Sequence, residues 1–130
     1  MATGRGSASW SVRAIVALMA VSVLLLQADY VQAAKTYTVG DSRGWAFNTV
    51  GWPRGKQFKA GDVLVFNYSP SFHNLVVVNS EGYKKCVTPA LAKKYTSGKD
   101  RITLSKGQHF FICDFPGHCE SDMKIAVTAV

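Results

Sequence analysis

The sequence is poor in the side chains that most catalytic and metal sites need, because it has only three histidines and three cysteines. These six residues are His73, His109, His118, Cys86, Cys113 and Cys119. No Ser-His-Asp hydrolase arrangement can be recognised around them. Cys113 and His118 could imitate a Cys-His nucleophile, but that interpretation would leave His73 and Met123 unexplained. We therefore expect that the protein is not an enzyme.

Acidic residues are also scarce, with 8 Asp and Glu against 15 Lys and Arg and a formal net charge of +7. From Lys35 onward, seven acidic residues face thirteen basic ones. Six of the cations crowd one segment, as Lys84, Lys85, Lys93, Lys94, Lys99 and Arg101. Such a balance attracts acidic partners over long distances. An acidic cell-wall polysaccharide is the candidate partner, no nucleic-acid-binding motif is present, and a solvated face without any partner is the alternative.

No apolar run is long enough to span a bilayer comfortably, since that takes about 20 residues. The longest run, Ala14–Leu26, has 13 residues. Arg5 and Arg13 supply a positive region before it, and small residues follow at 31–34, as in a secretory signal peptide. Residues 1–34 are therefore predicted to be removed on secretion. A retained membrane anchor is the alternative.

The remaining residues, 35–130, are predicted to form one domain in the extracellular space, either the apoplast or the cell wall. No internal repeat or interdomain linker is visible. The polar spacer and hydrophobic tail of a lipid-anchor signal are missing after Met123. We therefore expect a soluble monomer without a membrane anchor.

The pattern of β-formers interrupted by Gly, Pro and Asn favours an all-β sandwich or barrel of about seven strands. The expected strands are residues 35–39, 63–68, 74–79, 101–104, 108–113 and 124–130, with a short strand after the aromatic-rich loop at 42–59. The apolar run Leu75–Val78 suits a strand covered on both faces. Short helical turns are expected only between residues 81 and 97, at Gly82–Cys86 and Ala90–Lys94, with Pro89 interrupting.

One stretch near the C-terminus carries the metal chemistry. Cys113, His118 and Met123 follow one another at intervals of five residues. Thiol, imidazole and thioether are the soft and borderline ligands that copper prefers over magnesium, calcium or manganese. A blue copper site takes a Cys, two His and a long axial Met. One imidazole is therefore still to be found.

The second imidazole must come from His73 or His109. His109 precedes Cys113 by four residues on an expected strand, and at ~3.3 Å per residue the two lie roughly 13 Å apart. That distance is too long for one ion. His73 stands at the head of the strand 74–79, which could lie beside the Cys113 loop. We assign His73, Cys113, His118 and Met123 as copper ligands and His109 as a non-ligand.

The third cysteine is explained if Cys113 binds the metal, because Cys86 and Cys119 then remain to pair. Secretion supplies the oxidising setting that a disulfide needs. Closing a loop of this length contributes on the order of 3 to 4 kcal/mol in the chain-entropy model. The bridge would also brace the residue next to His118.

The four ligands leave little room for a substrate, whereas catalytic metals keep an open coordination position. The sequence therefore indicates outer-sphere electron transfer. His118, on a compact turn, is the expected electron port, and His73 is expected in the interior. A dry shell is expected from Phe111, Phe115 and Pro116, while Asp114, Glu120 and Asp122 are interpreted as solvated loop residues.

At these residues the sequence resembles the phytocyanins, and most of all their basic blue, or plantacyanin, branch. The resemblance rests on Val39-Gly40-Asp41, Gly44-Trp45, Phe72-His73-Asn74, Phe111-Ile112-Cys113, Phe115-Pro116-Gly117-His118-Cys119 and Met123. It implies a cupredoxin-like Greek-key β-sandwich or barrel. It also implies one type 1 copper ion on the four assigned ligands, and a disulfide between Cys86 and Cys119.

Three functions remain in competition. The leading hypothesis is a secreted blue copper protein that carries single electrons to and from a small-molecule or protein partner that the sequence does not identify. The alternative is a basic extracellular-matrix, cell-wall or signalling protein in which copper is mainly structural. A copper store ranks third, because a rigid and buried site releases its metal slowly.

Overall fold

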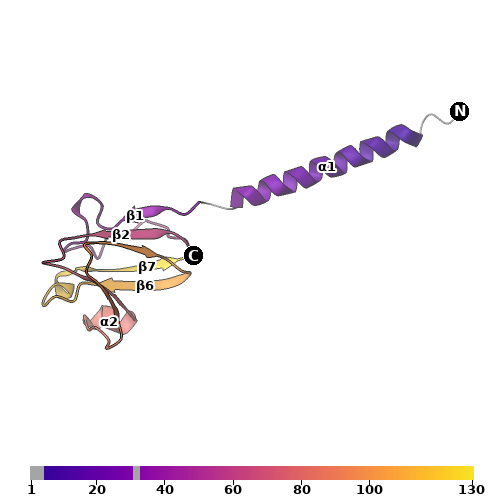
Figure 1. Cartoon of the computed structure of the whole chain (residues 1–130). Coiled ribbons are helices and arrows are strands. Elements are labelled where there is room, and N and C mark those ends of the chain that lie inside the picture. The colour runs from indigo at the N-terminus through magenta and orange to yellow at the C-terminus, as the bar shows by residue number, and fades with distance from the viewer. Residues whose placement is uncertain (1–4, 31–32) are drawn as a thin grey trace. The chain divides into compact units, whose positions relative to one another are not determined.

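The structure is a computed structural model that describes residues 5–30 and 33–130. The chain divides into two units, Met1–Ala33 and Ala34–Val130. Helix α1 (Arg5–Tyr30) belongs to the first unit (Figure 1). None of the helices among the described residues is long and apolar enough to cross a membrane. Residues 1–4 and 31–32 of the predicted signal peptide lie outside the described residues, and its removal stays a prediction.

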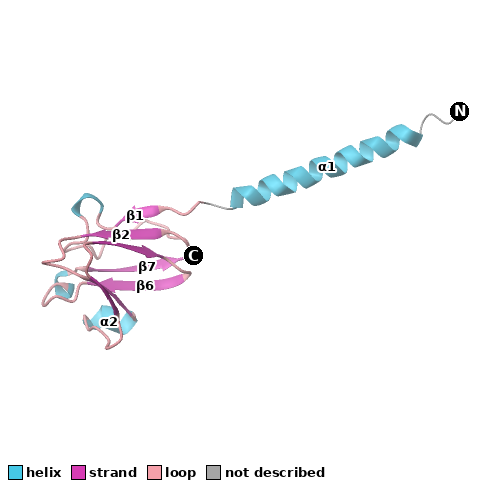
Figure 2. Ribbon diagram, viewed as in Figure 1, coloured by secondary structure: helices cyan, strands magenta, loops and turns pink. Residues whose placement is uncertain are grey.

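The unit Ala34–Val130 is built of two β-sheets, as Figure 2 shows. The described part of the chain has seven strands: β1 (Thr36–Thr38), β2 (Val63–Asn67), β3 (Leu75–Val78), β4 (Lys93–Tyr95), β5 (Lys99–Thr103), β6 (Gly107–Ile112) and β7 (Lys124–Ala129). One sheet has the order β1-β2-β5 and the other the order β4-β3-β6-β7. Only the β1–β2 pair among these strands is parallel. The prediction of an all-β fold with about seven strands is confirmed.

Strand β3 is covered on both faces, as its unbroken apolar run predicts. Leu75 belongs to the main core, together with Trp45, Phe66, Phe111 and other buried side chains. Val76 and Val78 point to a second apolar cluster, which the partly buried Tyr83 of helix α2 (Ser80–Lys85) covers. Successive side chains of a strand point to opposite faces, so β3 stands between two apolar layers.

One of the two expected helical turns is confirmed and the other is wrong. Helix α2 begins after Asn79, whose side-chain oxygen accepts a hydrogen bond from the backbone N–H of Gly82 at 2.8 Å. The stretch Ala90–Lys94 is not helical, because β4 starts at Lys93 and pairs antiparallel with β3. Alanine, leucine and lysine favour a helix locally, but here the free edge of β3 offers backbone hydrogen bonds that outweigh the preference.

The loop between β1 and β2 fixes the backbone beside His73. It starts with a short 3₁₀ helix, η1 (Asp41–Arg43), and Gly44 follows with a φ of 70°. A Cβ at Gly44 would lie 2.7 Å from the carbonyl oxygen of Asn67, so the close approach of loop and strand requires glycine. Trp45 then enters the core, where its Nε1–H donates a hydrogen bond to the Asn74 carbonyl oxygen at 2.9 Å.

The pairing of β3 with β6 brings the two halves of the predicted site together. These strands are antiparallel, with Val76 opposite Ile112. The start of β3 therefore lies beside the end of β6. His73 is two residues before β3, and Cys113 follows β6 directly. His73 and Cys113, forty residues apart in the sequence, are thus brought together by the pairing of β3 with β6.

Candidate metal centre

Three of the four predicted ligands converge at this end of the sandwich. His73, Cys113 and His118 each offer one ligand atom, and these atoms all lie within 4.8 Å of one another. The Nδ1 atoms of the two imidazoles are 3.1 Å apart. The Cys113 Sγ lies 3.5 Å from His118 Nδ1. The two histidines therefore turn the same ring nitrogen toward each other, and that of His118 also faces the thiol.

Met123 is brought back to Cys113 by the backbone of the loop between them. The N–H of Cys113 donates to the Met123 carbonyl oxygen at 3.1 Å, and the N–H of Met123 donates to the His118 carbonyl oxygen at 3.1 Å. The short 3₁₀ helix η2 (Cys119–Ser121) completes the turn. The side chains of Met123 and Cys113 are fully buried in the same core cluster. The thioether is thus held next to the three converging ligands.

The protonation of the site is set by its burial. Burial raises the pKa of the Cys113 thiol, although the N–H groups of Asn74 and Phe115 oppose the rise. Burial also lowers the pKa of His73, and the imidazole of His118 lowers it further. The site therefore favours a neutral His73. A metal that binds the thiolate must displace the Cys113 proton.

Aromatic rings surround the two imidazoles. Phe47 lies edge-on to both of them, with centroid distances of 5.4 Å to His73 and 4.8 Å to His118. Phe115 lies 5.6 Å from His118. Phe47 was not among the predicted shell residues, because nothing in the sequence connects the 42–59 loop to this end of the sandwich. Of the predicted shell, Pro116 is exposed and does not help to exclude water.

The exposure of the two histidines differs from the prediction for His73. His118 is half-buried and reaches the surface, as expected. His73 is half-buried as well and is not an interior residue. Most of the strand that follows it is buried, but His73 precedes that strand on a turn whose neighbour Phe72 is exposed. Both imidazoles therefore have an edge toward solvent.

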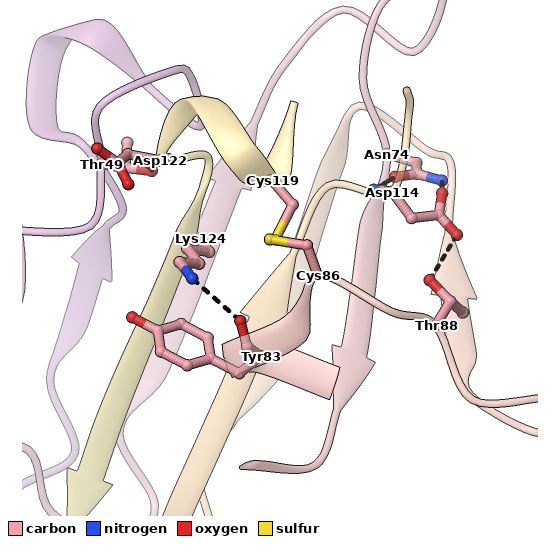
Figure 3. The surroundings of a disulfide bond; sticks show 9 residues. All are labelled: Thr49, Asn74, Tyr83, Cys86, Thr88, Asp114, Cys119, Asp122 and Lys124. Atoms are coloured by element: carbon pink, nitrogen blue, oxygen red, sulfur yellow. Dashed lines mark hydrogen bonds between the residues drawn. A yellow bond between two sulfur atoms is a disulfide. The ribbon is translucent and has the colours of Figure 1, made fainter. Parts of the chain in front are cut away.

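Asp114 is not the solvated loop residue that its sequence position suggests. Its carboxylate accepts hydrogen bonds from Asn74 Nδ2 at 2.6 Å and from Thr88 Oγ1 at 2.9 Å (Figure 3), and it lies 2.9 Å from the Lys94 ammonium. Burial by itself would raise the pKa of Asp114, but Lys94, Asn74 and Thr88 outweigh it and the pKa lies below its ordinary value. Asp114 thus ties together the segments that carry His73 and Cys113.

His109 lies apart from the site, on β6. Its Nε2 is 2.7 Å from the carbonyl oxygen of Ser105. The group of candidate ligands found among residues 5–30 and 33–130 does not include it. This position agrees with the strand spacing in the sequence, which predicts that His109 is not a ligand.

The disulfide between Cys86 and Cys119 is present and braces the loop that carries His118. Cys86 ends helix α2 in a left-handed conformation, with a φ of 53°. Figure 3 shows Cys119 bonded to Cys86. Cys119 begins η2 and directly follows His118 in the chain. The two Cα atoms are 5.6 Å apart, and Cys113 is left as a buried free thiol. The pairing expected from the cysteine count is confirmed.

The residues present fit a copper ion. At metal–nitrogen distances of about 2.0 Å and metal–sulfur distances of about 2.3 Å, as for zinc, two nitrogens on one ion are at most about 4.0 Å apart, and a nitrogen and a sulfur at most about 4.3 Å. The N–N separation of 3.1 Å and the S–N separation of 3.5 Å lie within these limits. Two imidazoles, one thiol and a thioether form the donor set of a blue copper site.

Comparison with known sequences finds close relatives along the whole chain. The Plastocyanin-like domain family matches residues 43–123. The chain is 78% identical to the basic blue protein of Arabidopsis thaliana over 130 residues, which cover all of both chains. It is 53% identical to chemocyanin of Lilium longiflorum over 129 residues, or 99% of each chain.

Comparison with solved structures also finds blue copper proteins. The structure of cucumber basic protein, a blue copper protein, superposes with a TM-score of 0.73 at 64% identity. The match covers 73% of this chain and 99% of the cucumber chain.

Proposed function

The chain belongs to the phytocyanins, the plastocyanin-like proteins of the cupredoxin superfamily, and is of their basic blue type; on that premise we propose that it is a secreted carrier of single electrons. It is a blue copper protein with one copper ion. The observation that carries the proposal is the convergence of two Nδ1 atoms and one Sγ beside a buried thioether.

The proposed ligands are His73, Cys113, His118 and Met123. When bound, copper supplies a one-electron couple between Cu(II) and Cu(I). The chain's own residues hold the donors still: strand pairing fixes Cys113 against the His73 segment, and the loop bonds fix His118 and Met123. Ligands that stay in place through a change of charge keep the reorganisation of the site small, which favours outer-sphere transfer.

The route for the electron is proposed to be the exposed edge of the imidazoles. Cys113 and Met123 are fully buried, whereas His73 and His118 are half-buried. A buried thiol and thioether leave no open side for a substrate, and catalytic metal sites need one. We therefore infer that the protein is not an enzyme and exchanges electrons across the imidazole edges.

The location is proposed to be extracellular, in the apoplast or cell wall. Three observations support it: the signal-peptide pattern of residues 1–34, the disulfide of the second unit, and the relation to plant blue copper proteins. A tagged form of the full chain recovered from the cell-wall fluid, without residues 1–34, is the expected outcome. Recovery inside the cells with the N-terminus intact would contradict the proposed location.

The copper assignment is tested by colour. The purified protein loaded with Cu(II) is expected to show an intense thiolate-to-copper absorption band toward the red end of the visible spectrum. Cys113→Ser should abolish the band, because it removes the thiolate. His109→Gln is the matched control and should keep it, since His109 lies outside the ligand group. A band that survives Cys113→Ser would refute the assignment.

A second candidate function is the binding of an acidic polysaccharide of the cell wall, and the distribution of charge favours it. Strands β4 and β5 form edges of the two sheets and are separated by three residues. Their exposed cations are Lys93, Lys94, Lys99 and Arg101, here called the basic edge. The one carboxylate between them, Asp100, is buried and hydrogen-bonded to Tyr68 and Ser97. The basic edge thus presents positive charge without an exposed acid.

This second function is tested by reversing charges while leaving the metal site alone. The triple variant Lys93→Glu, Lys99→Glu, Arg101→Glu should elute from a polygalacturonate column at much lower salt and keep the absorption band. The control is the same number of reversals at Lys35, Arg54 and Lys106, which lie outside the basic edge. If both triple variants elute at equally reduced salt, binding depends on net charge alone and not on the basic edge.

A further inference from the structure

Among the described residues, a single ion pair lies near the metal centre, and it connects that centre to the basic edge. Lys94 Nζ lies 2.9 Å from Asp114 Oδ2, and the side chains are 53% and 18% exposed. One partner is thus reachable from solvent while the other is mostly buried. Asp114 follows Cys113 in the chain, so its negative charge stands one residue from the thiol.

The Asp114 carboxylate is also anchored from the His73 side. Its Oδ1 accepts from Asn74 Nδ2, and the N–H of Asp114 donates to Asn74 Oδ1 at 3.0 Å. Thr88 holds the other oxygen (Figure 3). These bonds to Asn74 and Thr88 hold the carboxylate in place without Lys94. Lys94 is the more exposed member of the pair and has a long side chain with several rotatable bonds, so it is the member that a partner can draw away.

A fixed carboxylate beside the site opposes the arrival of an electron, and the ammonium of Lys94 offsets that effect. Loss of the ammonium would leave the Asp114 charge uncompensated and favour the more positive, oxidised ion. We propose that Lys94 is a positioning residue that couples the basic edge to the copper centre, and that an acidic polysaccharide engaging Lys94 draws it from Asp114 and lowers the reduction potential. The coupling to potential rests on the proposed copper function.

The coupling works in both directions. If the polysaccharide lowers the potential, the oxidised protein must bind the polysaccharide more tightly than the reduced protein by the same factor. Partly exposed ion pairs change an equilibrium by up to about fivefold. We therefore expect roughly a threefold effect, or about 28 mV at 59 mV per tenfold for one electron.

Lys93 provides a matched control. It lies on the same strand and carries the same charge, but its Nζ stands over the Tyr95 ring at 5.3 Å instead of on a carboxylate. Lys93→Gln and Lys94→Gln therefore remove equal charge from adjacent positions of β4. Only Lys94→Gln removes the ammonium that pairs with the Asp114 carboxylate.

The first experiment measures reduction potentials at low salt for the copper-loaded wild-type protein, Lys94→Gln, Lys94→Arg and Lys93→Gln. Lys94→Gln should shift the redox equilibrium about threefold toward the oxidised form, Lys93→Gln clearly less, and Lys94→Arg should restore the wild-type value. Saturating polygalacturonate should lower the potential of the wild type and of Lys93→Gln, but should add little to Lys94→Gln. Equal shifts in Lys94→Gln and Lys93→Gln would overturn the proposal.

The second experiment needs no copper. If Asp114 and a polysaccharide compete for Lys94, Asp114→Asn should strengthen polygalacturonate binding by the metal-free protein about threefold more than Glu120→Gln does. Glu120 is an exposed acid of the same loop, so the net charge changes equally. Equal effects of the two variants would refute the competition. A missing blue band in the wild type would refute the copper function alone, so the two failures are distinguishable.

Discussion

Met123 is the residue whose substitution reports most directly on the electron-carrier function. It is fully buried in the core cluster that contains Cys113. Met123→Gln replaces a soft thioether by a harder amide oxygen, which favours Cu(II) over Cu(I). We expect the potential to fall by more than about 59 mV, a tenfold change in the one-electron equilibrium. Spectroelectrochemical titration measures it.

The control for this substitution is Met123→Leu, which keeps an apolar side chain of similar volume and offers no donor atom. It should shift the potential in the opposite direction. If neither variant moves the potential, Met123 is a core residue and not a ligand. The basic edge is untouched in both variants, so a biological effect that persists in Met123→Gln would favour polysaccharide binding over electron transfer.

Tyr68 provides a second prediction at the scale of one residue. Burial raises the pKa of Tyr68 far above its ordinary value, and its hydrogen bond to Asp100 adds to the rise. The folded protein thus keeps a proton that the unfolded chain loses near pH 10. Because the folded pKa is the higher one, this contribution to stability is complete below about pH 10 and is lost as the pH rises above it.

Tyr68→Phe should therefore be less stable than the wild type at pH 7, by about 1 to 3 kcal/mol, since buried Asp100 loses a hydrogen-bond partner. The difference should shrink as the pH rises from 9 to 11. Urea unfolding of both metal-free proteins across this range measures the difference. A gap that widens with pH would contradict the assigned direction of the pKa shift.

At the residue scale, the sequence predicts which residue types bind the metal, but it does not predict the contacts that surround them. The ligand types follow from what copper binds, and the exclusion of His109 follows from strand spacing. Asp114 was misjudged, because its partners Asn74, Thr88 and Lys94 come from three other segments. Phe47 was missed for the same reason. Contacts between segments far apart in the chain leave no local pattern to read.

At the scale of elements, the disulfide is the feature that holds the His118 turn. Cys86 and Cys119 are separated by 33 residues, and the bridge links the end of α2 to the start of η2. Replacing both cysteines by alanine should lower the free energy of unfolding by about 3 to 4 kcal/mol in the chain-entropy model. Urea unfolding of the metal-free protein measures this loss.

The double alanine variant has a second expected effect, which separates bracing of the turn from general stability. Copper should be released to a chelator faster than from the wild type at a temperature where both are folded, because His118 adjoins the bridge. The surface variant Lys106→Ala is the reference for handling and assay. Equal release rates would show that the backbone bonds of the turn suffice without the bridge.

The secondary-structure prediction is most accurate where the sequence pattern fits only a strand. The predicted bounds of β3, an apolar run, and of β2, which follows the Gly61-Asp62 turn, agree with the structure to within one residue at each end. The stretch Ala90–Lys94 was wrong, since its residues favour a helix and only the vacant edge of β3 decides otherwise. An edge strand gains its hydrogen bonds from a neighbour, and that neighbour is not visible in the local sequence.

At the scale of the whole molecule, the metal centre is attached to a scaffold that has its own core. The main cluster joins both sheets through buried side chains such as Leu64, Phe66, Phe111 and Ile125. The second cluster fills the space beneath α2. Only Cys113 and Met123 belong both to the core and to the proposed ligand set. The free energy of folding therefore comes mostly from burial that does not involve the metal.

Copper removal should consequently leave the protein folded but less stable. A ligand that binds only the folded state adds RT ln(1 + [L]/Kd), or about 4 kcal/mol at a thousandfold excess over Kd. We expect the metal-free protein to keep its far-ultraviolet circular dichroism and to unfold in one cooperative transition at a lower temperature. Zn²⁺, which accepts the same nitrogen and sulfur ligands, should raise that temperature without restoring the colour. Loss of the β-sheet signal on copper removal would contradict this expectation. It would mean that folding of the two sheets depends on metal binding by the loop Cys113–Met123.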